Sequence, residues 1–265
     1  MASKSTFPKL TPWDETRETL HAYARVLGAI RAAFTPELPR DEHGSLRLYT
    51  SGLTTTPIPH PLNTSRNFSL SLDLRNHYVL FSTSEGDVHQ WRISEGLSAT
   101  KLGEQIIAKL AEMDVHGKIN QRKFASDRPN NYAFDEAERY FGILSQVGRL
   151  FENLSEALPG EKSPVLVWPK LFDLSFALLG TSPDSQILFG FSPAGAGIDG
   201  AYFFVSPAPF QQDLLQQTLP TGARWHTSGW QGALLPYAEV ADKADTAKRI
   251  QDFLQGAYQL QKSIL

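Results

Sequence analysis

The segment Gly52-Leu53-Thr54-Thr55-Thr56-Pro57-Ile58-Pro59-His60-Pro61 restricts the fold more than any other part of the chain. Each proline biases the residue before it towards an extended backbone. Because successive amides of a strand point to opposite edges, the three prolines remove the N–H donors from one edge only. We therefore predict an edge strand or the wall of a cleft, with the proline-blocked edge facing a cleft or solvent.

The composition is that of a soluble globular protein. The 265 residues are 41% hydrophobic and 20% charged, and the formal net charge is −3. This balance argues against a chain-wide basic field for nucleic acid. No window has the roughly 18 apolar residues that a membrane span needs, and residues 1–10 lack the apolar core of a signal peptide. There is no cysteine, which excludes disulfides and thiolate chemistry. We expect a cytoplasmic protein that binds neither nucleic acid nor membrane.

The first half of the chain reads as a helix, a group of strands and a second helix. Apolar residues at helical spacing predict a helix over 12–34. Strict alternation in 68–74, followed by turns and by extended segments at 78–83 and 88–93, predicts an antiparallel meander. A second helix is predicted from Ser98, with Met113 as the last residue of its apolar side and Gly117 beyond its end.

The second half repeats this order. The polar, non-periodic residues 118–132 predict a connection, and the apolar spacing from Tyr140 to Leu158 predicts the strongest helix. Several extended segments and a closing helix follow. We predict an α+β fold in which antiparallel sheets are covered by four main helices. The predicted divisions are a tail (1–12), a first lobe (13–117), a connection (118–132) and a second lobe (133–265), with the lobes packed as one unit. Duplication and coincidence both remain open as the origin of the repeated order.

The run from Gly195 to Gly200 has the glycine spacing of a dinucleotide fingerprint. That fingerprint requires a helix directly after the glycines. Here the following residues, 201–205, are aromatic and β-branched, which favours a strand and therefore a glycine-rich hairpin loop. The seven histidines show no metal-ligand spacing. The sequence predicts neither a cofactor nor a metal.

Three residues are candidates for acid–base chemistry: His60, Asp173 and His226. The two histidines lie in extended segments with proline, hydroxyl or aromatic neighbours. Asp173 interrupts an apolar run, where a carboxylate is costly to bury without a partner. An exposed Asp173 and packed, structural histidines are the alternative interpretation of the same pattern. A structure in which the three share no cavity would contradict a common site.

Six further residues are candidates for ligand contacts. The hydroxyls would act as donors and the aromatic rings as walls of a small-molecule pocket, although core packing is the alternative for each ring. The six are Thr54, Thr55, Thr56, Trp168, Trp230 and Tyr237.

Three motifs resemble an uncharacterised family of bacterial proteins that carry a domain of unknown function. They are the segment 52–61, Phe172-Asp173-Leu174 inside a strand, and Leu234-Leu235-Pro236-Tyr237 before the last helix. The resemblance runs from Trp13 to the closing helix and implies a cytosolic protein without an assigned activity. It also implies a His-Glu pair near Phe189-Gly190, which this sequence lacks.

The resulting hypothesis is a cytosolic protein that binds a small molecule, with enzymatic activity left open, at a pocket near residues 52–61. The alternative is a non-catalytic interaction or dimerisation module that uses the apolar stripes of the first and third helices; a homo-oligomer is compatible with the sequence. Burial of Leu27, Tyr140, Leu144 and Phe151 distinguishes the two, because a docking stripe has to be exposed.

Overall fold

A computed structural model describes residues 7–10, 12–195, 197–220 and 222–265. Most of the predicted tail therefore lies outside the described residues. The chain divides into two compact units. The N-terminal unit contains Pro12–Phe141 and Val167–Phe172; the C-terminal unit contains Met1–Thr11, Gly142–Leu166 and Asp173–Leu265. The boundary between these units falls inside a long helix, α3 (Phe134–Ala157), between Phe141 and Gly142.

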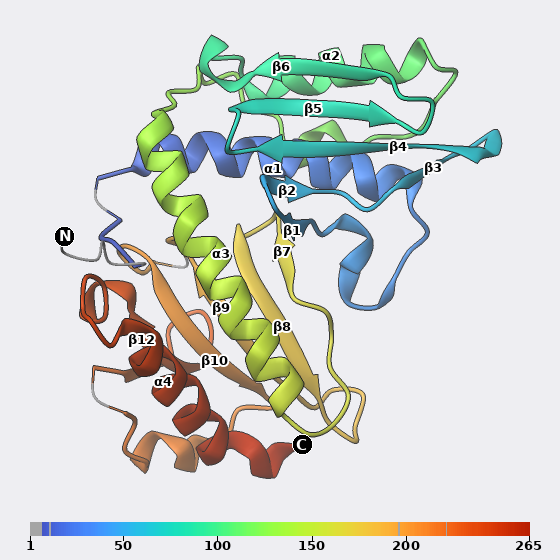
Figure 1. The fold of residues 1–265 in the computed structure, drawn as a ribbon. Coiled ribbons are helices and arrows are strands. Elements are labelled where there is room, and N and C mark those ends of the chain that lie inside the picture. The colour runs from blue at the N-terminus through green and yellow to red at the C-terminus, as the bar shows by residue number, and fades with distance from the viewer. Residues whose placement is uncertain (1–6, 11, 196, 221) are drawn as a thin grey trace. The chain divides into compact units, whose positions relative to one another are not determined.

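The N-terminal unit is built on an antiparallel sheet with the order β1-β2-β4-β5-β6, to which β3 is added beside β4. Its strands are β1 (Arg47–Tyr49), β2 (Gly52–Thr54), β3 (Ile58–His60), β4 (Asn63–Asp73), β5 (Tyr78–Thr83) and β6 (Val88–Arg92). The helices α1 (Asp14–Phe34) and α2 (Ala99–Ala111) cover one face of this sheet (Figure 1). Ser98 caps α2 through its hydroxyl, which accepts the Lys101 amide. The predicted meander and both predicted helices are confirmed.

The proline-rich segment splits into two strands that both pair with β4. Among the described residues β3 pairs with β4 alone, so it is an edge strand, and Pro57, Pro59 and Pro61 are exposed. β2 instead lies between β1 and β4, because residues 52–54 precede the prolines and keep both sets of backbone groups. The edge prediction is therefore correct for β3 and not for β2.

The C-terminal unit is built on a second antiparallel sheet, with the order β11-β12-β10-β9-β8-β7. Its strands are β8 (Asp173–Leu179), β9 (Gln186–Ser192), β10 (Tyr202–Ala208), β11 (Arg224–His226) and β12 (Gly232–Pro236). Of the last strand in the order, β7 (Leu166–Trp168), only Leu166 belongs to the C-terminal unit. β9 and β10 pair as the two arms of a hairpin, and the glycine-rich run, of which Ala196 lies outside the described residues, falls between them as predicted. No helix N-terminus follows it, which rules out the dinucleotide interpretation.

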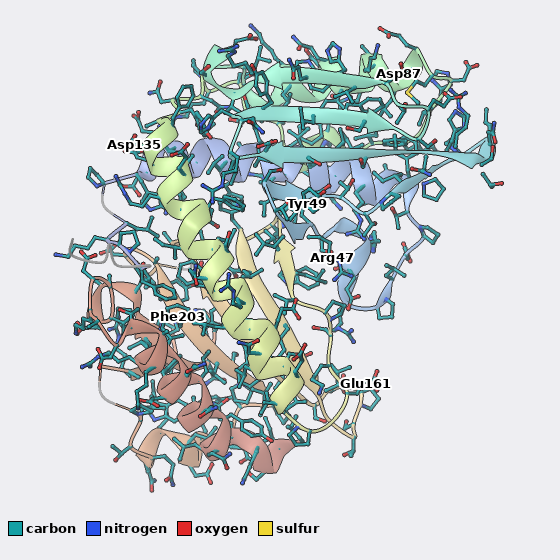
Figure 2. All side chains as sticks on the ribbon, viewed as in Figure 1. Arg47, Tyr49, Asp87, Asp135, Glu161 and Phe203 are labelled. Atoms are coloured by element: carbon teal, nitrogen blue, oxygen red, sulfur yellow. The ribbon has the colours of Figure 1, made fainter. Side chains whose placement is uncertain are left out.

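One face of the second sheet packs against α4 (Thr246–Gln261) and the C-terminal part of α3 (Figure 1). Alternate residues of β8, β9 and β10 are fully buried on this face, as alternation along a strand requires. Phe176 stacks on Phe189 at 4.9 Å between ring centroids, and Phe151 of α3 meets Phe176 edge-on. Phe203, labelled in Figure 2, continues this apolar layer next to Phe191.

The opposite face, which we call the Asp173 face, carries the intervening residues. The register sets Tyr202 opposite Ser192 and continues to Asp173 at the start of β8. Tyr202 and Phe204 form a small apolar cluster with Leu234. The described residues form two antiparallel sheets and four α-helices, which confirms the predicted α+β class. Within the described ranges, none of the helices has the length and apolar character needed to cross a membrane.

Candidate functional site

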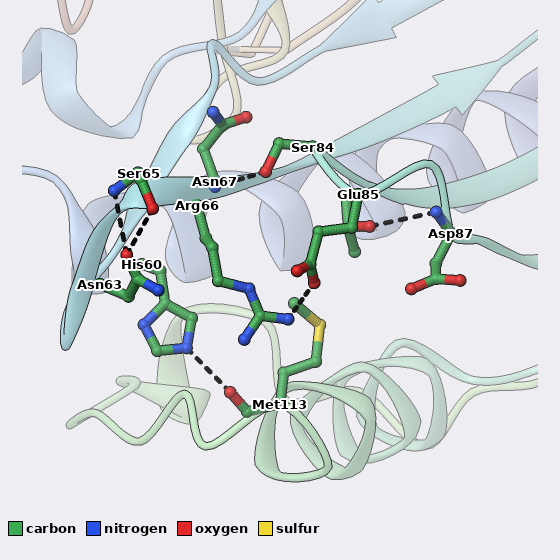
Figure 3. Close-up of polar contacts among 10 residues, drawn as sticks. His60, Asn63, Ser65, Arg66, Asn67, Ser84, Glu85, Asp87 and Met113 are labelled. Carbon is green, nitrogen blue, oxygen red and sulfur yellow. Dashed lines mark hydrogen bonds and ion pairs between the residues drawn. The ribbon is translucent and has the colours of Figure 1, made fainter.

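His60 joins the edge strand β3 to the end of α2. Its side chain is buried, and both ring nitrogens have partners, of which Figure 3 shows the Met113 carbonyl. The Leu62 amide donates to Nδ1 at 3.1 Å, so Nε2 carries the hydrogen that is donated to the Met113 carbonyl at 2.8 Å. The imidazole therefore has no free nitrogen for a ligand in this arrangement.

The threonines of the same segment bond mainly to β4. The Thr54 hydroxyl lies 2.8 Å from the Ser71 hydroxyl, and the Thr55 hydroxyl accepts the Leu70 amide at 3.0 Å. Thr55 lies between β2 and β3. Its hydroxyl accepts the hydrogen bond from a β4 amide that a backbone carbonyl would accept in a regular strand pair. Thr56 is half-buried. Two of the three hydroxyls thus form hydrogen bonds within the sheet.

A pocket of about 510 Å³ lies in the N-terminal unit where β5 and β6 extend beyond the end of α2. Met113 is part of its lining and also accepts the His60 hydrogen bond, which makes this the pocket associated with the 52–61 segment. Arg66 is paired with Glu85 (Figure 3), and Lys109 with Glu112 at 2.7 Å. The lining residues are Arg66, Phe81, Thr83, Asp87, Val88, His89, Lys109, Glu112, Met113 and Asp114. Asp87 stands at the β5–β6 turn (Figure 2).

Asp173 is the most unusual titratable group of the C-terminal unit. The side chain is buried at the start of β8, with 8% of the residue exposed. The Ser192 side chain faces the carboxyl across the β8–β9 pair, and Oδ1 has no hydrogen-bond partner among the described residues. Burial raises the pKa of Asp173 to about 7, and the nearby Ser192 hydroxyl opposes this rise only in part.

Ser192 lies between Asp173 and Tyr202. The strand register brings Ser192 opposite Tyr202, and the Ser192 hydroxyl donates to the Ala194 carbonyl at 3.4 Å. Burial raises the pKa of Tyr202; the nearby Ser192 hydroxyl opposes this shift, and the negative charge of Asp173 adds to it. We call Asp173, Ser192 and Tyr202 the carboxyl cluster. Its three members come from adjacent strands and lie in one row across the Asp173 face.

Trp230 and His226 extend this row with aromatic surface. The Trp230 ring is nearly parallel to that of Tyr202, with 6.2 Å between centroids and 12° between planes. His226 lies 4.5 Å from Trp230, and its Nε2 lies 2.7 Å from the Ser228 carbonyl oxygen. Both side chains are half-buried, so the aromatic surface is accessible at this end.

Trp168 and Tyr237 have structural contacts. The Trp168 carbonyl accepts the Phe172 amide at 2.7 Å in the turn after β7. The Tyr237 hydroxyl donates to the Pro8 carbonyl at 2.8 Å, and its ring packs against Phe191 in the core. Tyr237 therefore lies in the interior of the C-terminal unit.

The predicted site residues are thus divided between the units. His60, Trp168 and the threonines belong to the N-terminal unit, and Asp173, His226, Trp230 and Tyr237 to the C-terminal unit. Within the latter, Asp173 is linked to Trp230 and His226 through the row of Asp173, Ser192 and Tyr202, because the Tyr202 ring contacts Trp230 and Trp230 contacts His226. Ser192 and Tyr202 complete that row and were missed by the sequence analysis. The glycine-rich hairpin between them was the available signal, because a hairpin sets the residues at its two ends opposite each other.

Comparison with known proteins gives one match. The model of a family of unknown function, DUF5996, matches residues 7–183 and 181–263. No curated protein and no solved structure matches the chain. Because the family match spans nearly the whole sequence, as the three sequence motifs predicted, the chain belongs to the DUF5996 family of unknown function.

Proposed function

We propose that this protein binds a small molecule on the Asp173 face of the second sheet, and that Asp173 anchors the ligand. The observation that carries the proposal is the buried carboxyl oxygen Oδ1, which has no hydrogen-bond partner among the described residues. Leaving such an atom unpaired costs about 1–3 kcal/mol. Buried polar groups in folded proteins are normally satisfied, so an exception calls for a functional explanation.

The surroundings of Asp173 support binding. Tyr202, Phe204 and Trp230 form an aromatic wall next to a single polar cluster. Small-molecule sites combine mainly apolar and aromatic walls with a few polar groups that fix orientation. The half-buried rings of Trp230 and His226 would provide the accessible side of the site.

The same carboxyl has the property required of an acid–base group. A pKa of about 7 lets Asp173 exchange a proton with a ligand near neutral pH. The hydroxyls of Ser192 and Tyr202 follow it in the same row across the sheet, so polar groups lie beside the carboxyl. We propose that any catalysis by this protein uses Asp173, and that His60 and the 52–61 threonines support the structure of the N-terminal unit.

The interaction-module alternative receives less support. Leu27, Tyr140, Leu144 and Phe151 are each at most 1% exposed. Tyr140 stacks on Trp13 at 4.6 Å, and Phe151 meets Phe176 at 5.8 Å, each within its own unit. Stripes that are already packed against the chain's own residues do not offer a docking surface.

Ligand retention tests the proposal. The chain is purified without denaturant and examined by native mass spectrometry as wild type, Asp173→Asn and Asp184→Asn. Asp184 is an exposed carboxylate of the same unit and serves as the matched control. We expect a bound mass in the wild type and the control, and its loss in Asp173→Asn. If no mass is retained, the three proteins are screened against a metabolite library by thermal shift. A ligand that stabilises all three equally, or no ligand at all, would contradict the proposal.

A further inference from the structure

The carboxyl cluster contains an acidic group without a basic partner. Among the described residues, no lysine or arginine forms an ion pair with Asp173, and none shifts its pKa. The titratable group that faces it is Tyr202 on β10; β9 contributes Ser192, and β8 itself contributes Ser175 as the next residue on this face. A buried carboxylate is stable only when an opposite charge or several hydrogen bonds compensate it.

The neighbouring rings suit a positive charge. Gly190 has no side chain, and a Cβ there would lie 2.1 Å from the Phe204 ring, so this ring lies across β9 next to the carboxyl cluster. Tyr202 and Trp230 border the same place. Aromatic faces attract organic cations, most strongly where water is excluded.

We propose that the ligand of the Asp173 face is an organic cation, an ammonium group with an apolar or aromatic substituent. The ammonium would pair with Oδ1 of Asp173, and the substituent would pack on Trp230 and Phe204. This inference rests on the proposed function and specifies its ligand class. A ligand that accepts a hydrogen bond from the protonated carboxyl, such as a carbonyl compound or an anion, is the competing class.

The two classes differ in the sign of their pH dependence. A cation binds the ionised carboxyl, so its affinity rises as the pH increases towards 7, where Asp173 loses its proton, and is constant above. Binding then releases a proton, roughly half of one per site at pH 7. An acceptor ligand binds the protonated form, so its affinity falls as the pH increases through 7.

Titration calorimetry with three probes of similar size separates the classes. The probes are benzyltrimethylammonium, benzyl alcohol and benzoate, and the measurements run from pH 5.5 to 8.5 in two buffers of different ionisation enthalpy. The permanent charge of the first probe removes any titration of the ligand itself. We expect the cation to bind most tightly, with an affinity that increases about tenfold per pH unit below 7 and with proton release.

Variants assign the effect to the carboxyl. Asp173→Asn should reduce the cation's affinity about tenfold or more at pH 8 and abolish the pH dependence, whereas Asp184→Asn should behave as the wild type. Ser192→Ala removes the neighbouring hydroxyl that lowers the pKa of Asp173, so it should keep cation binding and move its midpoint to higher pH. This variant tests the inference if Asp173→Asn does not fold.

Each outcome decides the inference. Tighter binding of benzyl alcohol or benzoate, or cation binding without pH dependence, would overturn the cation assignment while leaving a binding site at Asp173. Absence of binding by all three probes would also overturn it. The proposed function then still depends on the mass-spectrometric experiment, so the two failures are distinguishable.

Discussion

Asp173 faces Ser192 across the β8–β9 pair, and its buried Oδ1 has no hydrogen-bond partner among the described residues. The carboxyl is therefore buried without a group that neutralises its charge at this oxygen. In a buried setting this arrangement favours the protonated acid, and its consequences can be measured in stability as well as in binding.

The free energy of unfolding should depend on the pH through Asp173. The pKa of this carboxyl is about 7 in the folded chain and 3.8 as its reference value. Between these values the folded chain keeps a proton that the unfolded chain has lost, so stability falls as the pH rises from about 4 to about 7, by up to about 4 kcal/mol. Asp173→Asn removes this loss. Urea unfolding should show the variant gaining on the wild type from pH 5 to pH 8, and a constant difference would contradict the prediction.

The two hydrogen bonds of the His60 side chain should contribute to stability and not to ligand binding. His60→Ala removes the hydrogen bonds to Met113 and Leu62 and leaves a cavity, so we expect a loss of about 2–4 kcal/mol. His116→Ala, at a histidine with an exposed side chain in the same unit, is the control and should change stability by less than about 0.5 kcal/mol. Urea unfolding measures both. Unchanged stability together with lost ligand binding would instead assign His60 to a functional site.

The prolines of β3 should prevent edge-to-edge pairing. Pro57→Thr and Pro59→Thr together restore N–H donors on the exposed edge, which is a template for another strand. We expect concentration-dependent self-association in sedimentation velocity, with the helical circular dichroism unchanged. Replacing the exposed Pro39 by threonine, in the connection before β1, tests whether loss of a proline alone has this effect. A monomeric double variant would show that the edge is protected in another way.

Gly190 should be required for the aromatic wall. In Gly190→Ala the new Cβ would lie 2.1 Å from Cζ of Phe204, so the ring has to move, at a cost of about 1–3 kcal/mol. Gly142→Ala in α3 is the counterpart: its Cβ meets no atom within 4 Å, and helix propensity should stabilise the chain by about 1 kcal/mol. Opposite shifts in the midpoint of thermal unfolding are expected. A neutral Gly190→Ala would indicate that Phe204 does not lie against β9.

The helices and most strands follow from local pattern. The alternation of 68–74 and the helical spacing of 140–158 identified β4 and α3, because burial of one face repeats every second or every third to fourth residue. The three prolines identified the edge strand β3 for a reason that is equally local, the missing amide. The limits of the units were not predicted, since a continuous helical pattern does not show which part of α3 packs in which unit.

The candidate site, in contrast, depends on the tertiary structure as well as on local pattern. The sequence by itself selected Asp173, Trp230 and His226 as polar or aromatic residues in extended segments. Only the tertiary structure decided that Ser192 and Tyr202 belong with them, because the pairing of β8, β9 and β10 brings together residues far apart in the chain. The same pairing decides whether Asp173 is exposed or buried, and burial sets its pKa. Desolvation depends on every atom around the carboxyl, and no local pattern of residues encodes it.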